Sequence, residues 1–582
     1  MEGNSLLSLL LLPPSSSEML KLICLLLAIV PLASRASLHF QQGLDGTELN
    51  LGMGLSDKQL AIFAWLESLV SDSKADGDFP GIYKKNNTGN LPTQRGMPSY
   101  RYSLAFTAYA AAARTHTHTP AHTGPTFNLL STIFELMTRE EVWSYWDQKG
   151  DCAPFFLTTY CENHNTSMCD LNAAWRGGDA IRCPDPVYYG NIMYSGHLAH
   201  VGALVRLFAP SPEAAEDVLT FTLGSAQYTL DRLLYRLETQ ALSQAETFGG
   251  GITCEPGNVY PSCQSHLQAA LHLIDALDST SDEKHTSIRQ NWQHYLFNEN
   301  LQKGWDMPAG SMPWGERLFE IAQMTPRHSG IPDFGIPVSC AAHDVWVLAY
   351  LQSWAEDDIS GLPTSNYVLK RGRDLIRDHK GWSGGQLQDE RCKVLAGEED
   401  WDIASAMFSV VEAVVGDGDG EERSKEVLQR FEQQGKVAVK GKMFYYSSDY
   451  GLDVFTTTQL GMSMVTTNLT MASLHNEAGV ALLERREGRG WLEKVEAIEG
   501  DENVYVRKAK SDDNELVFSL VAGGERDRVR AYIGGLSGPE EDVRVSVGGE
   551  IIEEVSFDDD GYLIFDGTVQ DGIDSVFVVR WM

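Results

Sequence analysis

Apolar residues recur at helical spacing through most of the chain between about residues 57 and 483. Apolar positions at i, i+3, i+4 and i+7 are typical of helices that bury one face. The spacing predicts helices at 100–113, 127–137, 191–207, 214–237, 263–277, 343–354, 403–415 and 424–433. Glycine, proline and acidic loops separate these segments. Strand-like alternation is scarce in this part of the chain.

This succession predicts a mainly helical domain over residues 50–487. About a dozen helices in pairs, without an internal repeat strong enough for a solenoid, favour an (α/α) toroid whose inner helices line a central cavity. A simple helical bundle is the alternative.

The pattern changes after Arg489, where apolar and polar residues begin to alternate. Alternating runs begin at Asn503, Glu515, Arg528, Asp542 and Ser575. Gly-Gly, Ser-Gly and Asp-Asp-Gly turns divide them. We therefore predict a small antiparallel β-sandwich over residues 488–582, with a stabilising role favoured over ligand binding.

The first 36 residues are predicted to be a targeting segment that is cleaved near Ala36. Lys21 precedes an apolar run too short to span a bilayer comfortably, and small residues follow it. Sequons for N-glycosylation occur at Asn86, Asn165 and Asn468. Together these features predict a secretory-pathway protein of the ER lumen, the vacuole or the extracellular space. No later segment is apolar enough for a membrane span, so we expect none after cleavage.

Charge and cysteine content narrow the function classes. A formal net charge of −34 argues against a nucleic-acid partner, which requires a basic face. Four cysteines cluster in one loop, and in an oxidising compartment they predict two disulfides of undetermined pairing. They are Cys152, Cys161, Cys169 and Cys183. Because they lack any Cys-x-x-Cys spacing, we predict no metal site there.

A first group of chemically capable residues lies on the predicted helix 191–207. Met193, His197 and His200 share one face of it. Gly196 costs helix propensity beside His197, which indicates that a neighbouring backbone or a ligand approaches closely there. A buried structural histidine is the alternative interpretation.

A second group lies in the glycine-rich segment that leads into the helix at 263. Cys254, Glu255 and Cys263 can converge at the N-terminus of this helix, where backbone amides favour thiolate or carboxylate character. A Cys254–Cys263 disulfide is the alternative.

These motifs resemble the linalool dehydratase/isomerase family. The resemblance rests on four segments that occur in family order over about residues 98–480. They are Arg101-Tyr-Ser-Leu-Ala-Phe, Val142-Trp-Ser-Tyr-Trp, Asn191-Ile-Met-Tyr-Ser-Gly-His, and Cys254-Glu-Pro-Gly-Asn with Cys263 nine residues later. The resemblance implies an (α/α)6 barrel, no metal or organic cofactor, and reversible addition and removal of water coupled to allylic isomerisation of a monoterpene alcohol. The site residues that it implies are Tyr102, Met193, His197, Cys254, Glu255 and Cys263.

Such chemistry requires an acid near the hydroxyl group, a base near a carbon-bound hydrogen, and walls that tolerate cationic charge. We predict Glu255 or His197 as the group that protonates or activates the oxygen. Cys254 and Cys263 would transfer protons at carbon, and Tyr102 would orient the hydroxyl group.

Aromatic residues are candidates for the wall of the substrate cavity. Tyr194, Trp143, Trp146, Tyr188 and Tyr189 could face an allylic cation with their rings. Core packing is the alternative for aromatic residues at helical spacing. The expected ligand is a small apolar alcohol or alkene.

The chain departs from the family at several positions. The family takes an aspartate and a tyrosine from a neighbouring subunit, so a homo-oligomer is possible, but only Asp76, Asp78 and Tyr83 are candidates here. A further family tyrosine is replaced by Ala342. The cysteine-rich loop is an insertion, and the β-rich C-terminus is an addition.

Two other functions fit the predicted architecture. A secreted glycan hydrolase or lyase could use Glu255, Asp344 and Asp402, although their spacing does not single out a catalytic pair. A non-catalytic secreted binding protein would have its cavity filled by side chains and a disulfide between Cys254 and Cys263.

Overall fold

The chain is described here from a computed structural model. The structure describes residues 41–42, 48–49, 54–76, 100–143, 186–187, 191–224, 226–245, 249–252, 258–279, 282–300, 322–323, 341–357, 359–380, 382–383, 386–387, 399–433, 437–440, 443–448, 451–452, 454–467, 470–485, 489–499, 504–512, 514–522, 526–536, 542–570 and 574–581. One compact unit comprises Met1–Gly54 with Gly548–Glu550, and it contains the paired strands β1 (Gln41–Gln42) and β2 (Glu48–Leu49). The other unit comprises Leu55–Val547 with Ile551–Met582.

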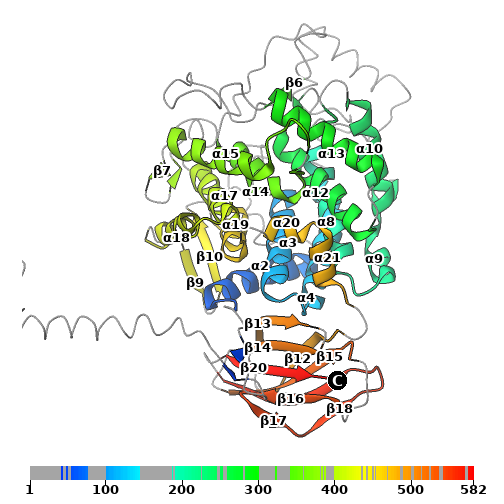
Figure 1. Cartoon of the computed structure of the whole chain (residues 1–582), viewed down its shortest axis with the longest axis vertical. Coiled ribbons are helices and arrows are strands. Elements are labelled where there is room, and N and C mark those ends of the chain that lie inside the picture. The colour runs from blue at the N-terminus through cyan, green and yellow to red at the C-terminus, as the bar shows by residue number, and fades with distance from the viewer. Residues whose placement is uncertain are drawn as a thin grey trace, which may run out of the picture. The chain divides into compact units, whose positions relative to one another are not determined.

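Six buried helices contact one another in succession within the larger unit (Figure 1). They are α3 (Tyr100–His118), α8 (Ile192–Phe208), α12 (Pro261–Leu277), α14 (Ala341–Tyr350), α17 (Glu399–Val415) and α19 (Val454–Val465). The last of them, α19, contacts α3 again, so the succession closes. We call these the six buried helices.

A second set of helices alternates with the six along the chain. They are α2 (Asp57–Asp76), α4 (Gly124–Met137), α10 (Leu230–Ser243), α13 (Glu283–His294), α15 (Ser365–Lys380) and α18 (Gly418–Gln433). Their sequences explain the difference in burial. In α10 only a stripe with helical spacing is buried, whereas α8 is apolar and buried on all sides.

Shorter elements connect these helices. The helical ones are α5 (Glu140–Trp143), α9 (Pro212–Leu219), η2 (Tyr295–Asn300), η3 (Leu351–Ser353), α20 (Thr470–Leu474) and α21 (Glu477–Leu483). The strands are β3 (Thr220–Leu223), β4 (Ala226–Thr229), β5 (Asn258–Val259), β6 (Ala322–Gln323), β7 (Trp382–Ser383), β8 (Gln386–Leu387), β9 (Val437–Lys440), β10 (Met443–Ser448) and β11 (Gly451–Leu452).

The prediction of one helix over 214–237 is wrong. The structure forms α9, the antiparallel hairpin β3–β4 and then α10 over this segment. Gly224, at the hairpin, adopts a φ of 58°, which suits glycine and interrupts a helix. Thr220, Thr222 and Thr229 are β-branched and favour strands at either side, and Thr229 also caps α10.

The predicted antiparallel strands after Arg489 are confirmed, and they form two sheets. One has the order β12-β15-β19-β18 and the other β13-β14-β20-β16-β17. The strands are β12 (Trp491–Glu499), β13 (Val504–Ser511), β14 (Glu515–Ala522), β15 (Arg526–Gly534), β16 (Arg544–Val547), β17 (Glu550–Ile552), β18 (Val555–Phe557), β19 (Leu563–Gln570) and β20 (Ser575–Arg580). Both sheets contribute to one core, where the ring of Phe577 lies 5.0 Å from that of Phe518 and 5.9 Å from that of Phe565.

The predicted mainly helical character is confirmed. Across the described residues, no helix is both long and apolar enough to cross a membrane.

Candidate active site

His197 lies in the second turn of α8 and is completely buried. Gly196 beside it explains how a second helix comes so close. A Cβ atom at Gly196 would lie 3.3 Å from the carbonyl oxygen of Cys263, in the first turn of α12. The missing side chain therefore lets the N-terminal turn of α12 approach the histidine, as the position of this glycine predicts.

Aromatic rings from two other buried helices surround His197. The ring of Tyr102 lies 5.3 Å from the imidazole in an edge-on arrangement, and Phe106 lies 5.7 Å from it. Trp346 of α14 lies 5.7 Å from the imidazole and 5.2 Å from Tyr102. Three aromatic rings, those of Tyr102, Phe106 and Trp346, thus surround the imidazole of His197. None of these three titrates near neutral pH.

One fixed positive charge lies beside this group. The guanidinium of Arg101 lies 4.5 Å from the centre of the Tyr102 ring and donates a hydrogen bond to the sulfur of Met193 at 3.2 Å. Burial lowers the pKa of His197 well below its usual value, and repulsion from His200 and Arg101 lowers it further. His197 is therefore neutral at physiological pH.

A chain of hydrogen bonds connects three other buried histidines. Trp346 Nε1 donates to His266 Nε2 at 2.8 Å. His266 Nδ1 lies 3.2 Å from His200 Nδ1, and His200 Nε2 lies 2.8 Å from His475 Nε2. His475 Nδ1 lies 2.8 Å from the backbone carbonyl of Met471. We call His266, His200 and His475 the histidine chain.

Both ends of the histidine chain fix the direction of every bond in it. An indole N–H can only donate, and a backbone carbonyl can only accept. His475 must therefore donate from Nδ1 and accept at Nε2, so His200 donates from Nε2 and accepts at Nδ1. His266 then donates from Nδ1 and accepts from Trp346. Each imidazole holds one proton, and each ring nitrogen has a partner.

The electrostatics agree with this assignment. Burial, followed by repulsion from neighbouring histidines, lowers the pKa values of His200 and His266 well below the usual value. Burial lowers the pKa of His475 to about 3. An additional proton on any of these rings would place two donors against each other, which a buried network does not tolerate.

His197 differs from the histidine chain because one of its nitrogens is unused. Its Nδ1 lies 2.8 Å from the hydroxyl group of Tyr109. Its Nε2 is buried and has no hydrogen-bond partner in the part of the chain that the structure describes. An unpaired buried polar atom costs about 1–3 kcal/mol. Among these four histidines, His197 is thus the one with a ring nitrogen available for a ligand.

The structure brings Tyr102, Met193 and His197 together where α3 and α8 meet, and the backbone carbonyl of Cys263 on α12 lies beside Gly196. Two other predicted residues are held by backbone carbonyls at the end of α4. Tyr194 donates to the carbonyl of Met137 at 2.9 Å, and Trp143 donates to that of Thr138 at 3.1 Å. Asp344 is buried in the first turn of α14. The remaining predicted positions lie outside the residues whose side chains the structure describes: Cys254, Glu255, Trp146, Tyr188, Tyr189, Asp76, Asp78, Tyr83, Ala342, Asp402, Cys152, Cys161, Cys169, Cys183, Asn86, Asn165, Asn468 and residues 1–36.

Sequence reasoning did not single out six residues of this site: Arg101, Phe106, Tyr109, His266, Trp346 and His475. Tyr109 had a usable signal, because Tyr102, Phe106 and Tyr109 are spaced i, i+4 and i+7 on one predicted helix face. His266 follows Cys263 by three residues and shares its face. His475 comes from a short loop-like region more than 270 residues from His200, and no local pattern connects the two.

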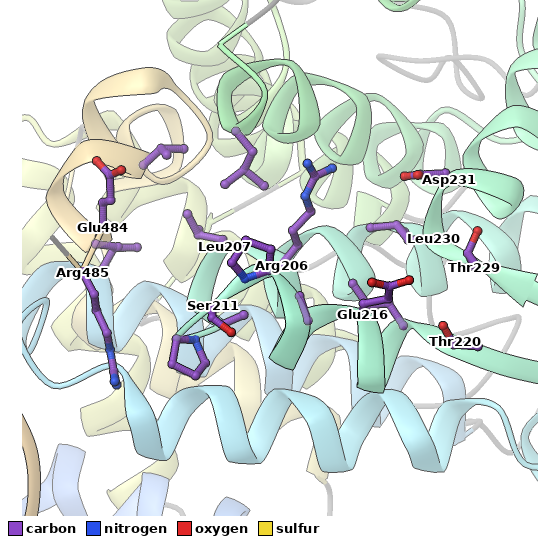
Figure 2. A pocket seen from close by; sticks show the side chains of 18 residues that line it. Arg206, Leu207, Ser211, Glu216, Thr220, Thr229, Leu230, Asp231, Glu484 and Arg485 are labelled. Atoms are coloured by element: carbon purple, nitrogen blue, oxygen red, sulfur yellow. The ribbon is translucent and has the colours of Figure 1, made fainter. Parts of the chain in front are cut away.

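A separate pocket of about 610 Å³ lies at the other end of α8 (Figure 2). Arg206, which lines it, follows His197 by nine residues, or about 14 Å along the helix axis. The arginines of this pocket are paired: Arg206 with Asp278, and Arg485 with Glu493 at 2.7 Å. The pocket is therefore distinct from the site around His197.

Residues 101–162 and 169–312 match the family model described as linalool dehydratase/isomerase. The family whose model matches is the one that the motifs indicate. The linalool dehydratase/isomerase match includes Tyr102, Met193, His197 and Cys263, and it supports lyase or isomerase activity in general. Trp346 and His475 lie beyond the matched residues.

No curated protein sequence matches the chain significantly. Among solved structures, a GH127 β-L-arabinofuranosidase from Geobacillus stearothermophilus T6 is similar, with 10% sequence identity and a TM-score of 0.20. The alignment covers 91% of this chain and 81% of that chain. A TM-score this low supports no argument about fold or function, so the linalool dehydratase/isomerase match is the informative comparison.

Proposed function

We propose that this protein is a hydro-lyase/isomerase that adds or removes water from a terpenoid or another apolar alkenol in secondary metabolism. Its acid–base chemistry would come from its own side chains, without a metal or an organic cofactor, as the family resemblance implies. The substrate class is a small apolar alcohol or alkene.

One observation carries the proposal: the unpaired Nε2 of His197 among aromatic rings, inside the segment that matches the family. Removal of water from an allylic alcohol needs a hydrogen-bonding group at the oxygen and walls that exclude stray water. His197 supplies the first. Tyr102, Phe106 and Trp346 supply rings whose faces stabilise a developing allylic cation.

The proposed dehydration uses two proton transfers. The C–O bond breaks with its electron pair on oxygen, and a proton from Glu255 completes the departing water molecule. A thiolate of Cys254 or Cys263 takes a proton from the neighbouring carbon, and the C–H electron pair forms the new double bond. His197 hydrogen-bonds to the oxygen, and Tyr102 orients it. Hydration is the reverse sequence.

An (α/α)6 barrel is the architecture that we propose for this chemistry. Two observations support it: the contacts of the six buried helices close on themselves, and buried helices alternate along the chain with helices that bury one stripe. A barrel of this kind would place the N-terminal turns of α8 and α12 at one end of its interior.

Product formation from candidate alcohols tests the proposal. We expect the purified protein to convert at least one of linalool, geraniol and longer prenyl alcohols, as detected by mass spectrometry. Cys254→Ala should lower the rate by about 10²–10⁴-fold, which is the usual effect of a positioned acid–base group. His197→Leu, which removes the hydrogen-bond donor, should lower it by about 10²–10³-fold. His116→Leu is the matched control, because His116 is also a buried histidine with one unpartnered ring nitrogen, but it lies in the last turn of α3 and is hydrogen-bonded to Ser473 at 3.0 Å instead of Tyr109.

Absence of turnover with every alcohol, together with release of a sugar from a glycan substrate, would contradict the proposal and favour a glycan-active enzyme. Binding of a ligand without turnover would favour a non-catalytic binding protein.

We also propose that the protein enters the secretory pathway and acts there, with a possible homo-oligomer completing the site. Cleavage near Ala36 and N-glycans at Asn86, Asn165 or Asn468 in the expressed protein, mapped by peptide mass spectrometry, would support this route. An uncleaved and unglycosylated protein would contradict it.

A further inference from the structure

We propose that Tyr109 is a positioning residue that holds His197 as the tautomer with its proton on Nε2. His197 then presents a hydrogen-bond donor, and not a base, to the substrate oxygen. This inference rests on the proposed function and specifies the direction of one hydrogen bond in the same site.

The Tyr109 hydroxyl group has a fixed position. Its ring stacks on His266, with centroids 4.9 Å apart and an interplanar angle of 10°, and on His200 at 4.4 Å and 28°. Both of these histidines are locked in the histidine chain by their own hydrogen bonds. The ring of Tyr109 is fully buried and packs against both histidines, so its hydroxyl group remains 2.8 Å from His197 Nδ1.

The direction of this bond follows from the number of polar groups that each alternative leaves unpaired. If Tyr109 donates to Nδ1, the His197 proton lies on Nε2, and that N–H is the single unpaired donor. If His197 Nδ1 donates instead, the Tyr109 proton and the Nε2 lone pair both lack partners within the described chain. Because buried unpaired groups are costly, the first arrangement is favoured.

The surroundings keep both partners neutral. Burial, and then the nearby Tyr350, raise the pKa of Tyr109 well above its usual value, so the phenol retains its proton. The ring of His266 is tilted against that of His197 with centroids 4.0 Å apart, but its two nitrogens are used by Trp346 and His200. Hydrogen bonding by Tyr109 is therefore the contact in the described chain that sets the His197 tautomer.

The tautomer has a mechanistic consequence. A neutral imidazole with its proton on Nε2 can polarise a hydroxyl oxygen by donating a hydrogen bond, but it cannot accept a proton at that nitrogen. The proton that leaves with water must then come from another group. This agrees with the proposed assignment of Glu255 as the acid and His197 as the group that orients and activates the oxygen.

The nitrogen shifts of the histidine ring test the inference without any substrate. The full chain labelled with ¹⁵N-histidine would be compared with Tyr109→Phe and with Tyr350→Phe, the His197 signals being identified by their loss in His197→Gln. Tyr350→Phe is the matched control, because it removes a buried hydroxyl group that contacts the Met462 sulfur at 3.4 Å instead of His197.

We expect wild type and Tyr350→Phe to show a protonated Nε2 and an unprotonated Nδ1 at His197, and Tyr109→Phe to show a mixture of tautomers. A protonated Nδ1 in wild type, or an unchanged tautomer in Tyr109→Phe, would overturn the inference. Both variants keep the aromatic ring, so equal thermal midpoints would confirm that neither is unfolded.

Turnover provides the second measurement. Tyr109→Phe should lower kcat by about tenfold with little change in KM, which is less than the roughly 10²–10⁴-fold expected for a residue that itself transfers a proton. A kcat equal to that of Tyr350→Phe would contradict the positioning role. If no alcohol is converted by wild type, the proposed function fails while the tautomer measurement still decides the role of Tyr109.

Discussion

Two groups of buried histidines in the helical part of the chain have opposite protonation states. The histidine chain contacts an indole N–H, other imidazoles and a carbonyl, and its members are neutral. His285 on α13 instead lies between two carboxylates, 2.6 Å from Asp275 and 2.8 Å from Glu238. Burial lowers the pKa of His285, but these two partners outweigh burial and raise it to about 9.

One helix contributes to both groups. On α12, His266 belongs to the histidine chain, and Asp275 pairs with His285 and also with Arg289. The difference teaches that the chemical nature of the partner, and not burial, decides whether a buried histidine is charged. The carboxylate-bound histidine links α10, α12 and α13 and has no spare nitrogen. His197, which is neutral like the members of the histidine chain, has a spare nitrogen at Nε2.

The largest expected effect is a loss of stability in acid. Histidines whose folded pKa is lowered stabilise the protein above the unfolded pKa of 6.5, and this is lost as the pH falls below it. Each one contributes about 1.4 kcal/mol per pH unit, or roughly 5 kcal/mol per pH unit for these four. His116, His122 and His272 add to the same slope, because burial lowers the pKa of each to about 4. Urea unfolding between pH 6.5 and 5 measures this slope.

His475→Gln should reduce the change of unfolding free energy with pH over this range by roughly 1.4 kcal/mol per pH unit, which is the contribution of about one proton. His285→Gln is the control, because His285 is protonated in both the folded and the unfolded protein in the lower part of this range. Equal slopes in wild type and His475→Gln would show that the histidine chain is not held neutral.

Removal of His266, the first member of the histidine chain, should have the next largest effect. His266→Leu leaves the Trp346 N–H and the His200 Nδ1 atom without their partner, and we expect a loss of about 4 kcal/mol in unfolding free energy. His272→Leu on the same helix should change it by less than about 1 kcal/mol, because the buried Nδ1 atom of His272 has no hydrogen-bond partner to lose in the described chain. Equal losses in the two variants would contradict the directed network.

His285 gives the smallest of the three effects, with the opposite dependence on pH. Because its folded pKa is raised from 6.5 to about 9, its contribution is complete below pH 6.5 and is lost as the pH rises through 9. We expect His285→Gln to cost about 3 kcal/mol at pH 6 and little above pH 9. A cost that is independent of pH would mean that His285 is not charged in the folded protein.

The sequence predicted the helices best where a helix buries either one face or its whole surface. The spacing of apolar residues located α8 and α12 to within two residues at each end. It failed at Thr220–Thr229, because a short hairpin between two helices keeps apolar positions at spacings that a continuous helix would also have. The propensity of threonine and the freedom of Gly224 decided the local structure there.

For the site, sequence reasoning found the residues that belong to local motifs and missed those that depend on tertiary contacts. His197 and Tyr102 lie in recognisable segments. Tyr109 becomes important only because α3 is packed against α8 in a register that puts its hydroxyl group on Nδ1. Trp346 and His475 likewise acquire their roles from contacts across 80 and 275 residues.

Isotope incorporation from solvent tests the central claim most directly. A candidate alkenol incubated with the protein in D₂O and H₂¹⁸O should acquire deuterium at carbon and ¹⁸O at the hydroxyl position, because reversible dehydration exchanges both with water. Both labels should be lost in His197→Leu, which removes the hydrogen-bond donor, and kept in His116→Leu. Recovery of every alcohol without either label, from a folded wild-type protein, would contradict the claim that this chain performs acid–base hydration chemistry.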